Sequence, residues 1–120
     1  MSHRRPRLIV VAALGSALAI TLPTVADNDE CDGATVIAPN SATDFHTAGA
    51  TESSEPYSSW QCSGTYFTAT GPDIWFKLHL SSPGALTLST CRAGSFDTDL
   101  SLYAGSCGLL TQVACNGDGP

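Results

Sequence analysis

The chain has 120 residues, of which 42% are hydrophobic and 13% charged, and its formal net charge is −6 at neutral pH. This length fits a single domain. The acidic balance argues against nucleic acid or an anionic membrane surface as a partner, because both require a clustered basic patch.

A short basic stretch and an apolar run open the chain. Three arginines lie within the first seven residues, Leu8–Leu22 is almost wholly apolar, and small residues lead to Ala26 before the sequence turns acidic. This order predicts a secretory signal peptide over residues 1–26, helical and cleaved after Ala26, and a secreted or otherwise extracytoplasmic product. An uncleaved membrane anchor is less favoured, because spanning a bilayer takes roughly 20 apolar residues. The Arg4-Arg5 pair leaves Sec and twin-arginine export both open.

Removal of this leader makes the rest of the chain strongly acidic. Residues 27–120 keep only Lys77 and Arg92 against all eleven Asp and Glu residues, which gives a net charge of −9. Divalent cations therefore suit this domain better than anionic partners.

Short apolar or alternating runs, separated by Gly, Pro, Ser, Asn and Asp, fill the region after the leader, which is typical of β-structure. A first strand is predicted at Ala34–Ala38. Weaker patterns suggest short strands at Phe45–Ala48 and Thr65–Ala69.

The clearest strand is predicted at Asp73–Leu80, where one face is apolar and the other is not. The apolar face consists of Ile74, Phe76, Leu78 and Leu80, and the other face consists of Trp75, Lys77 and His79. A turn at Ser81–Gly84 and renewed alternation over Ala85–Cys91 predict a hairpin with a half-buried first strand.

Two further strands are predicted at Asp99–Tyr103 and Leu110–Cys115, with a turn at Ala104–Gly108 between them. Beyond the leader, no ten-residue segment has apolar residues at helical spacing. We therefore expect an all-β domain, an antiparallel β-sandwich, because parallel strands tend to be continuous apolar runs joined by helices.

Five cysteines follow the leader: Cys31, Cys62, Cys91, Cys107 and Cys115. In an oxidising compartment each disulfide could add about 2–4 kcal/mol to a domain with a modest core. An odd number leaves one thiol either free or paired outside this chain, and the spacing does not decide the pairing.

Several stretches together resemble the bacterial pre-peptidase C-terminal domain family, in its cysteine-rich secreted form. They are Asn28–Cys31, Gly71–Lys77, Gly84–Cys91, Ser95–Tyr103, and Gly105–Gly108 leading into Val113–Asn116. The resemblance implies a jelly-roll β-sandwich that is appended to a secreted enzyme or adhesin and is not itself catalytic. Members continue past the position of Pro120 with another cysteine and more strands, so the resemblance also implies that domain 27–120 is incomplete at its C-terminal end.

Carboxylates gather near the start of this domain and near its last strands, and calcium prefers such hard oxygen donors. The candidate ligands are Asp27, Asp29, Asp32, Asp97, Asp99 and Asp118. The resemblance supports calcium, because some relatives bind it near the start of the domain. The alternative is that these residues form turns and provide solubilising charge, with Asp97 and Asp99 capping backbone amides.

No catalytic residue is predicted. A small hydrolase built on Asp97 and Asp99 would need a cleft and a raised pKa on one carboxyl, and the sequence indicates neither. Trp75 is a candidate ligand-binding residue because the alternation turns it away from the apolar face; the alternative is that it packs in the core.

The expected function is that of a non-catalytic extracytoplasmic β-sandwich module of a secreted or cell-surface protein, with an adhesive or accessory, stabilising role. A carbohydrate- or protein-binding module using exposed aromatic residues is the alternative. The expected partners are other domains of a longer parent protein, or an extracellular protein or polysaccharide.

Overall fold

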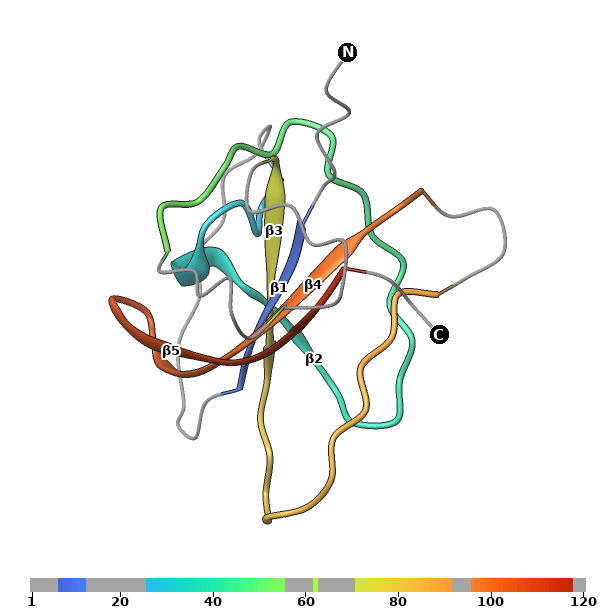
Figure 1. Cartoon of the computed structure of the whole chain (residues 1–120), viewed down its shortest axis with the longest axis vertical. Helices are drawn as coiled ribbons and strands as arrows, with labels where there is room; N and C mark the ends of the chain where they lie inside the picture. Colours follow the sequence, from blue (N-terminus) through green and yellow to red (C-terminus); the bar gives the residue numbers. More distant parts are fainter. Residues whose placement is uncertain (1–6, 13–25, 56–61, 63–70, 92–95, 118–120) are drawn as a thin grey trace.

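The computed structural model describes residues 7–12, 26–55, 62, 71–91 and 96–117. Within these ranges five strands form one sheet in the order β2-β3-β1-β4-β5 (Figure 1). The elements are β1 (Arg7–Ala12), the short 3-10 helix η1 (Cys31–Gly33), β2 (Thr35–Ile37), β3 (Asp73–Leu78), β4 (Asp99–Ser106) and β5 (Leu109–Asn116). The sheet, with almost no helix beside it, confirms the expected all-β class.

The centre of the sheet is β1, which comes from the apolar N-terminal run. It lies between β3 and β4 and is parallel to both, and Figure 1 shows it in blue between these strands. Leu8, Ile9, Val10 and Val11 are all buried. The sequence predicts a signal-peptide helix over this segment, whereas residues 7–12 are extended in the folded chain. The aliphatic, largely β-branched side chains of residues 8–11 suit a strand that is covered on both faces.

The strand directions differ from the antiparallel arrangement expected from the sequence. The pairs β1–β3, β1–β4 and β2–β3 are parallel, and of the described pairs only β4–β5 is antiparallel. The reason is visible in residues 8–11 of β1 and in β3, which are buried without alternation, as in parallel sheets with two covered faces. A second sheet, which a sandwich would require, is not seen among the described residues.

Both faces of this sheet carry a buried cluster. The Trp75 face consists of Ile9, Val11, Cys31, Trp75, Tyr103 and Leu110. The Phe76 face consists of Leu8, Val10, Ile74, Phe76 and Leu78, with partly buried residues such as Phe45, Leu86 and Leu88 packed against it. Strand β3 is therefore buried on both faces, not half-buried as its alternation suggested.

Four of the predicted strands are confirmed, and the hairpin is not. Strands β2, β3, β4 and β5 lie at the predicted positions, although β3 ends at Leu78 and β4 continues to Ser106 through part of the predicted turn. The segment 85–91 forms no strand. Its half-buried leucines, Leu86 and Leu88, cover the Phe76 face of the sheet and do not extend its edge. Residues 45–48 are not a strand either, and the predicted strand at 65–69 lies outside the described residues.

Two disulfides cross-link the chain. Cys31 is joined to Cys107 over a sequence separation of 76 residues, and Cys62 to Cys115 over 53. Cys91 is the free thiol, and it is exposed. Among the described residues, no helix is long and apolar enough to cross a membrane.

Candidate functional site

A polar cluster with a buried centre lies at the start of β3, and we call it the Ser53 cluster. Of its members, Ser53, Asp73 and Trp75 are buried, Asp29 is partly buried and Thr51 is exposed. The Ser53 hydroxyl donates to Asp73 Oδ1 and accepts a 2.8 Å hydrogen bond from Trp75 Nε1. The Ser53 backbone N–H donates to Asp73 Oδ2 at 3.1 Å. Asp73 is fully buried, so these donors stabilise a carboxylate that has no access to water.

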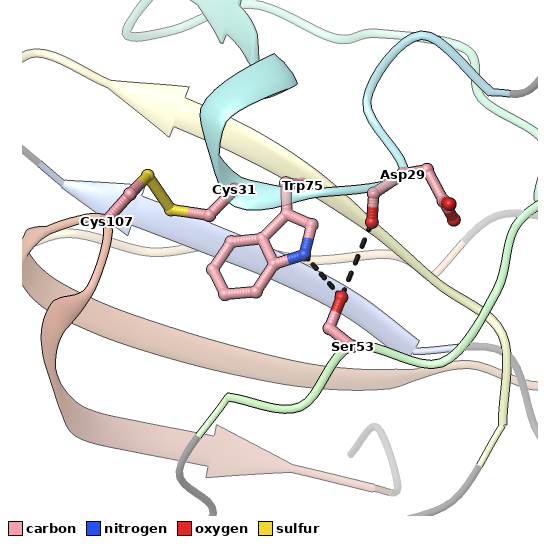
Figure 2. Close-up of a disulfide and its surroundings, with 5 residues drawn as sticks. All are labelled: Asp29, Cys31, Ser53, Trp75 and Cys107. Atoms are coloured by element: carbon pink, nitrogen blue, oxygen red, sulfur yellow. Dashed lines mark hydrogen bonds between the residues drawn. A yellow bond between two sulfur atoms is a disulfide. The ribbon is translucent and has the colours of Figure 1, made fainter.

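The same cluster joins three parts of the chain. Asp29 accepts hydrogen bonds from the backbone N–H of Thr51 at 2.6 Å and from its hydroxyl at 2.9 Å. The Asp73 N–H donates to the Thr51 carbonyl at 2.9 Å. Figure 2 shows Ser53 pointing towards the Trp75 indole and the Asp29 backbone, with the Cys31–Cys107 disulfide beside them.

Asn28 extends this attachment along β3. Its carbonyl accepts from the Trp75 backbone N–H at 2.7 Å, and its side-chain amide donates to the Trp75 carbonyl at 3.0 Å. The turn that follows the predicted cleavage position is therefore attached to β3.

Although a serine beside an aspartate could suggest a nucleophile, the environment of Ser53 does not. The residue is buried, and its hydroxyl proton is already directed at the Asp73 carboxylate. A nucleophilic serine needs a base beside it and access for a substrate. The Ser53 cluster is therefore suited to a structural role, and the sequence pattern gave no indication of Ser53.

The six predicted calcium ligands do not come together as a metal site in the described part of the chain. No group of three or more His, Cys, Asp or Glu residues there could hold a metal ion. Asp29 is hydrogen-bonded to Thr51, and Asp99 is buried at the start of β4. The residues at positions 27, 32 and 97 are exposed, and Asp118 lies outside the described residues. Calcium binding remains a prediction.

Asp97 and Asp99, the carboxylate pair considered for a hydrolase, differ in their exposure to solvent. Asp97 is exposed, whereas Asp99 has 0% exposure. Two carboxylates that share one substrate cleft would both have to reach it. Asp97 lies in the exposed segment before β4, whereas Asp99 is the first residue of the strand and is buried there.

Glu30 lies in the acidic turn beside the Ser53 cluster. Glu30 is exposed, but loss of hydration where it meets the surrounding chain raises its pKa above the ordinary value. The neighbouring carboxylates of Asp29, Asp73, Glu55 and Asp32 raise it further, in that order. The negative charges around Glu30 therefore oppose its ionisation.

Trp75 lies in the core, with 0% exposure, and its indole packs 5.8 Å from the Tyr103 ring. It offers no ring face to a sugar or protein ligand, which agrees with core packing and not with the binding role considered for it. The large exposed hydrophobic residues in the described ranges are Val36, Phe96, Leu109 and Val113.

A groove of about 780 Å³ lies over the Phe76 face. Its floor includes Leu8, Val10 and Phe76, and its sides are the segments 41–45 and 87–91. Phe45 stacks edge-on against Phe76 and against Phe96. The free thiol of Cys91 lies on the rim of this largely apolar groove.

Comparison with protein-family models, with curated proteins and with solved structures found no match. The resemblance to the pre-peptidase C-terminal domain family therefore rests on the sequence stretches alone and remains a prediction.

Proposed function

We propose that this chain is an exported, non-catalytic β-module of a secreted or cell-surface protein, processed after Ala26, with an adhesive or accessory role. The observation that carries this proposal is the pair of disulfides, Cys31–Cys107 and Cys62–Cys115. Such bonds persist in oxidising compartments and are rare in reducing ones. The basic and apolar start of the chain supports the same destination.

The absence of catalysis is supported by how the polar side chains are used. Ser53 and Asp73 bind each other in the interior, and Asp29 binds Thr51. These groups hold segments of the chain together, as expected of a domain whose role is binding or support. The family resemblance, which implies an appended module, points the same way.

Export can be tested by fusing residues 1–26 to a reporter enzyme that is active only outside the cytoplasm. We expect activity from the native leader and loss of activity from a leader carrying Leu14→Arg and Leu18→Arg, which interrupt the apolar run but lie outside β1. When the complete chain is expressed, N-terminal sequencing of its exported product should begin at Asp27. A reporter that remains inactive with the native leader would overturn the proposal.

The disulfides and the accessory role need separate measurements. Non-reducing peptide mapping of the exported chain should recover the Cys31–Cys107 and Cys62–Cys115 peptides. The purified chain should show no turnover of ester, peptide or glycoside substrates, and turnover abolished by Ser53→Ala would contradict the non-catalytic assignment.

A further inference from the structure

We propose that the space between β3 and β4, filled by β1 in the full chain, is a binding site for an extended strand supplied by a partner polypeptide once the leader has been removed. This inference rests on the proposed processing after Ala26. The occupant is a peptide with one basic residue followed by four aliphatic residues, bound parallel to β3 and β4.

The first argument is the pairing of β1. All six of its residues are in register with β3 on one side and with β4 on the other. Removing β1 leaves both neighbouring strands with open edges that face each other. Buried backbone N–H and C=O groups are almost always hydrogen-bonded. A replacement strand would therefore restore the backbone hydrogen bonds that β3 and β4 lose when β1 is absent.

The second argument is that residues 27–120 hold the two sides of this site together without β1. On the β3 side, Asn28 is hydrogen-bonded to Trp75, and η1 follows it directly. The disulfide from Cys31 in η1 reaches Cys107, next to the end of β4. A covalent link therefore spans the position of β1 and keeps β3 and β4 within reach of a common ligand.

The third argument is the order of events. In the folded chain, the Ala26 carbonyl accepts a hydrogen bond from the Asp29 N–H, and Ala26 packs against the Phe76 face. A processing enzyme needs an extended, accessible segment at its cleavage position, so cleavage has to precede folding. The exported domain then folds without β1 and with the site open.

The side chains that line the site define its ligand. Leu8 and Val10 pack into the Phe76 face, whereas Ile9 and Val11 pack into the Trp75 face. Both faces of the strand position are therefore apolar, and a partner strand needs aliphatic residues at four consecutive positions. Backbone pairing gives such strand addition its affinity, and side-chain pockets give it specificity.

The first position of β1, residue 7, sets a preference for the charge of the ligand. Asp73 and Asp99 are both fully buried, and both are in register with position 7 of β1, one on each side. By register, that position of the ligand comes between two acidic residues of the neighbouring strands, so a basic residue is favoured there and an acidic residue is opposed.

The test uses the full chain with a specific protease site introduced between residues 20 and 25. The purified, folded chain is cut, and a fluorescent peptide with the sequence of residues 4–14 is added. We expect the peptide to bind, as measured by fluorescence anisotropy, and to raise the thermal midpoint of the cut chain. Retention of the chain's own cut leader, seen by native mass spectrometry and displaced by excess peptide, also supports the site.

Two variant peptides provide matched controls. A peptide with Ile9→Asp and Val10→Asp should not bind, and one with Arg7→Glu should bind at least tenfold more weakly than the native peptide. Equal binding by native and Asp-containing peptides would overturn the proposal. So would a cut chain that loses its leader, keeps its thermal midpoint and ignores the peptide. Export of the reporter fusion is measured independently, so a failed strand-binding test leaves the proposed function standing, and a failed export test does not affect peptide binding.

Discussion

At the scale of single residues, the Ser53 hydroxyl is hydrogen-bonded to two buried side chains at once. It donates to Asp73 and accepts from the Trp75 indole. Ser53→Ala would leave a buried carboxylate oxygen and an indole N–H each short of a partner. Since an unsatisfied buried group costs about 1–3 kcal/mol, we expect a loss of that order in unfolding free energy, measured by urea denaturation.

The neighbouring Ser54 provides the control for Ser53, because it is exposed. Ser54→Ala should change the unfolding free energy by less than about 0.5 kcal/mol. If both variants unfold at the same urea concentration as the native chain, the Ser53 cluster does not support the fold.

The acidic turn gives a prediction about pH. The folded-state pKa of Glu30 is raised above its ordinary value of 4.5, so the folded chain holds this proton more tightly than the unfolded chain does. The contribution of Glu30 to stability is therefore greatest at pH below 4.5, and it is lost as the pH rises through the raised pKa.

Glu30→Gln removes this penalty at neutral pH. We expect a gain in unfolding free energy of less than about 1 kcal/mol at pH 7, because Glu30 is exposed and its repulsion is screened. Denaturation curves at pH 7 and pH 3.5 should show the gain shrinking at the lower pH. Glu52→Gln, at an exposed position that does not raise the pKa of Glu30, should show a smaller effect. A gain that grows on acidification would contradict the assignment.

At the scale of elements, β1 decides whether the sheet is continuous. Val10 is 2% exposed and lies between β3 and β4, whereas Val36 in β2 is 65% exposed. Val10→Ala in the full chain should therefore cost about 2 kcal/mol of unfolding free energy through lost burial and a residual cavity. Val36→Ala should be close to neutral. Equal effects would mean that β1 is not part of the folded sheet.

The elements also show what the sequence can and cannot predict. Strands β2, β3, β4 and β5 were predictable because alternating runs end at glycine or polar turns, as at Gly108, whose positive φ of 83° suits glycine. The prediction of a strand at 85–91 was wrong because alternating apolar residues indicate that one side of a segment is buried, not that its backbone pairs with another strand. Leu86 and Leu88 achieve that burial by lying over the sheet.

The role of β1 was not predictable from local pattern. An apolar run after arginines has the composition of a leader, and the same composition suits a strand buried on both faces. Pairing partners nearly 70 residues away along the chain in β3, and farther still in β4, decide the outcome. The Ser53 cluster was missed for a similar reason, since Ser53 and Asp73 meet only through tertiary structure.

At the scale of the whole molecule, the disulfides compensate for a small core. The Cys31–Cys107 bond closes a loop with a sequence separation of 76 residues, and loop-closure entropy assigns roughly 4 kcal/mol to a loop of that size. Replacing both cysteines with alanine should lower the unfolding free energy by about that amount. The same change should weaken strand binding, because this bond spans the site between β3 and β4.

Cys91→Ala is the matched control for the disulfide variant, because it removes an exposed free thiol and closes no loop. It should leave the thermal midpoint within about 2 °C of the native value, whereas the double variant should melt far below it. Thiol titration of the native chain should find one reactive group before denaturation, and that group should be absent from the Cys91→Ala chain. If the double variant kept the native midpoint, the link between η1 and the end of β4 would be dispensable. The two sides of the strand site would then depend on β1 alone.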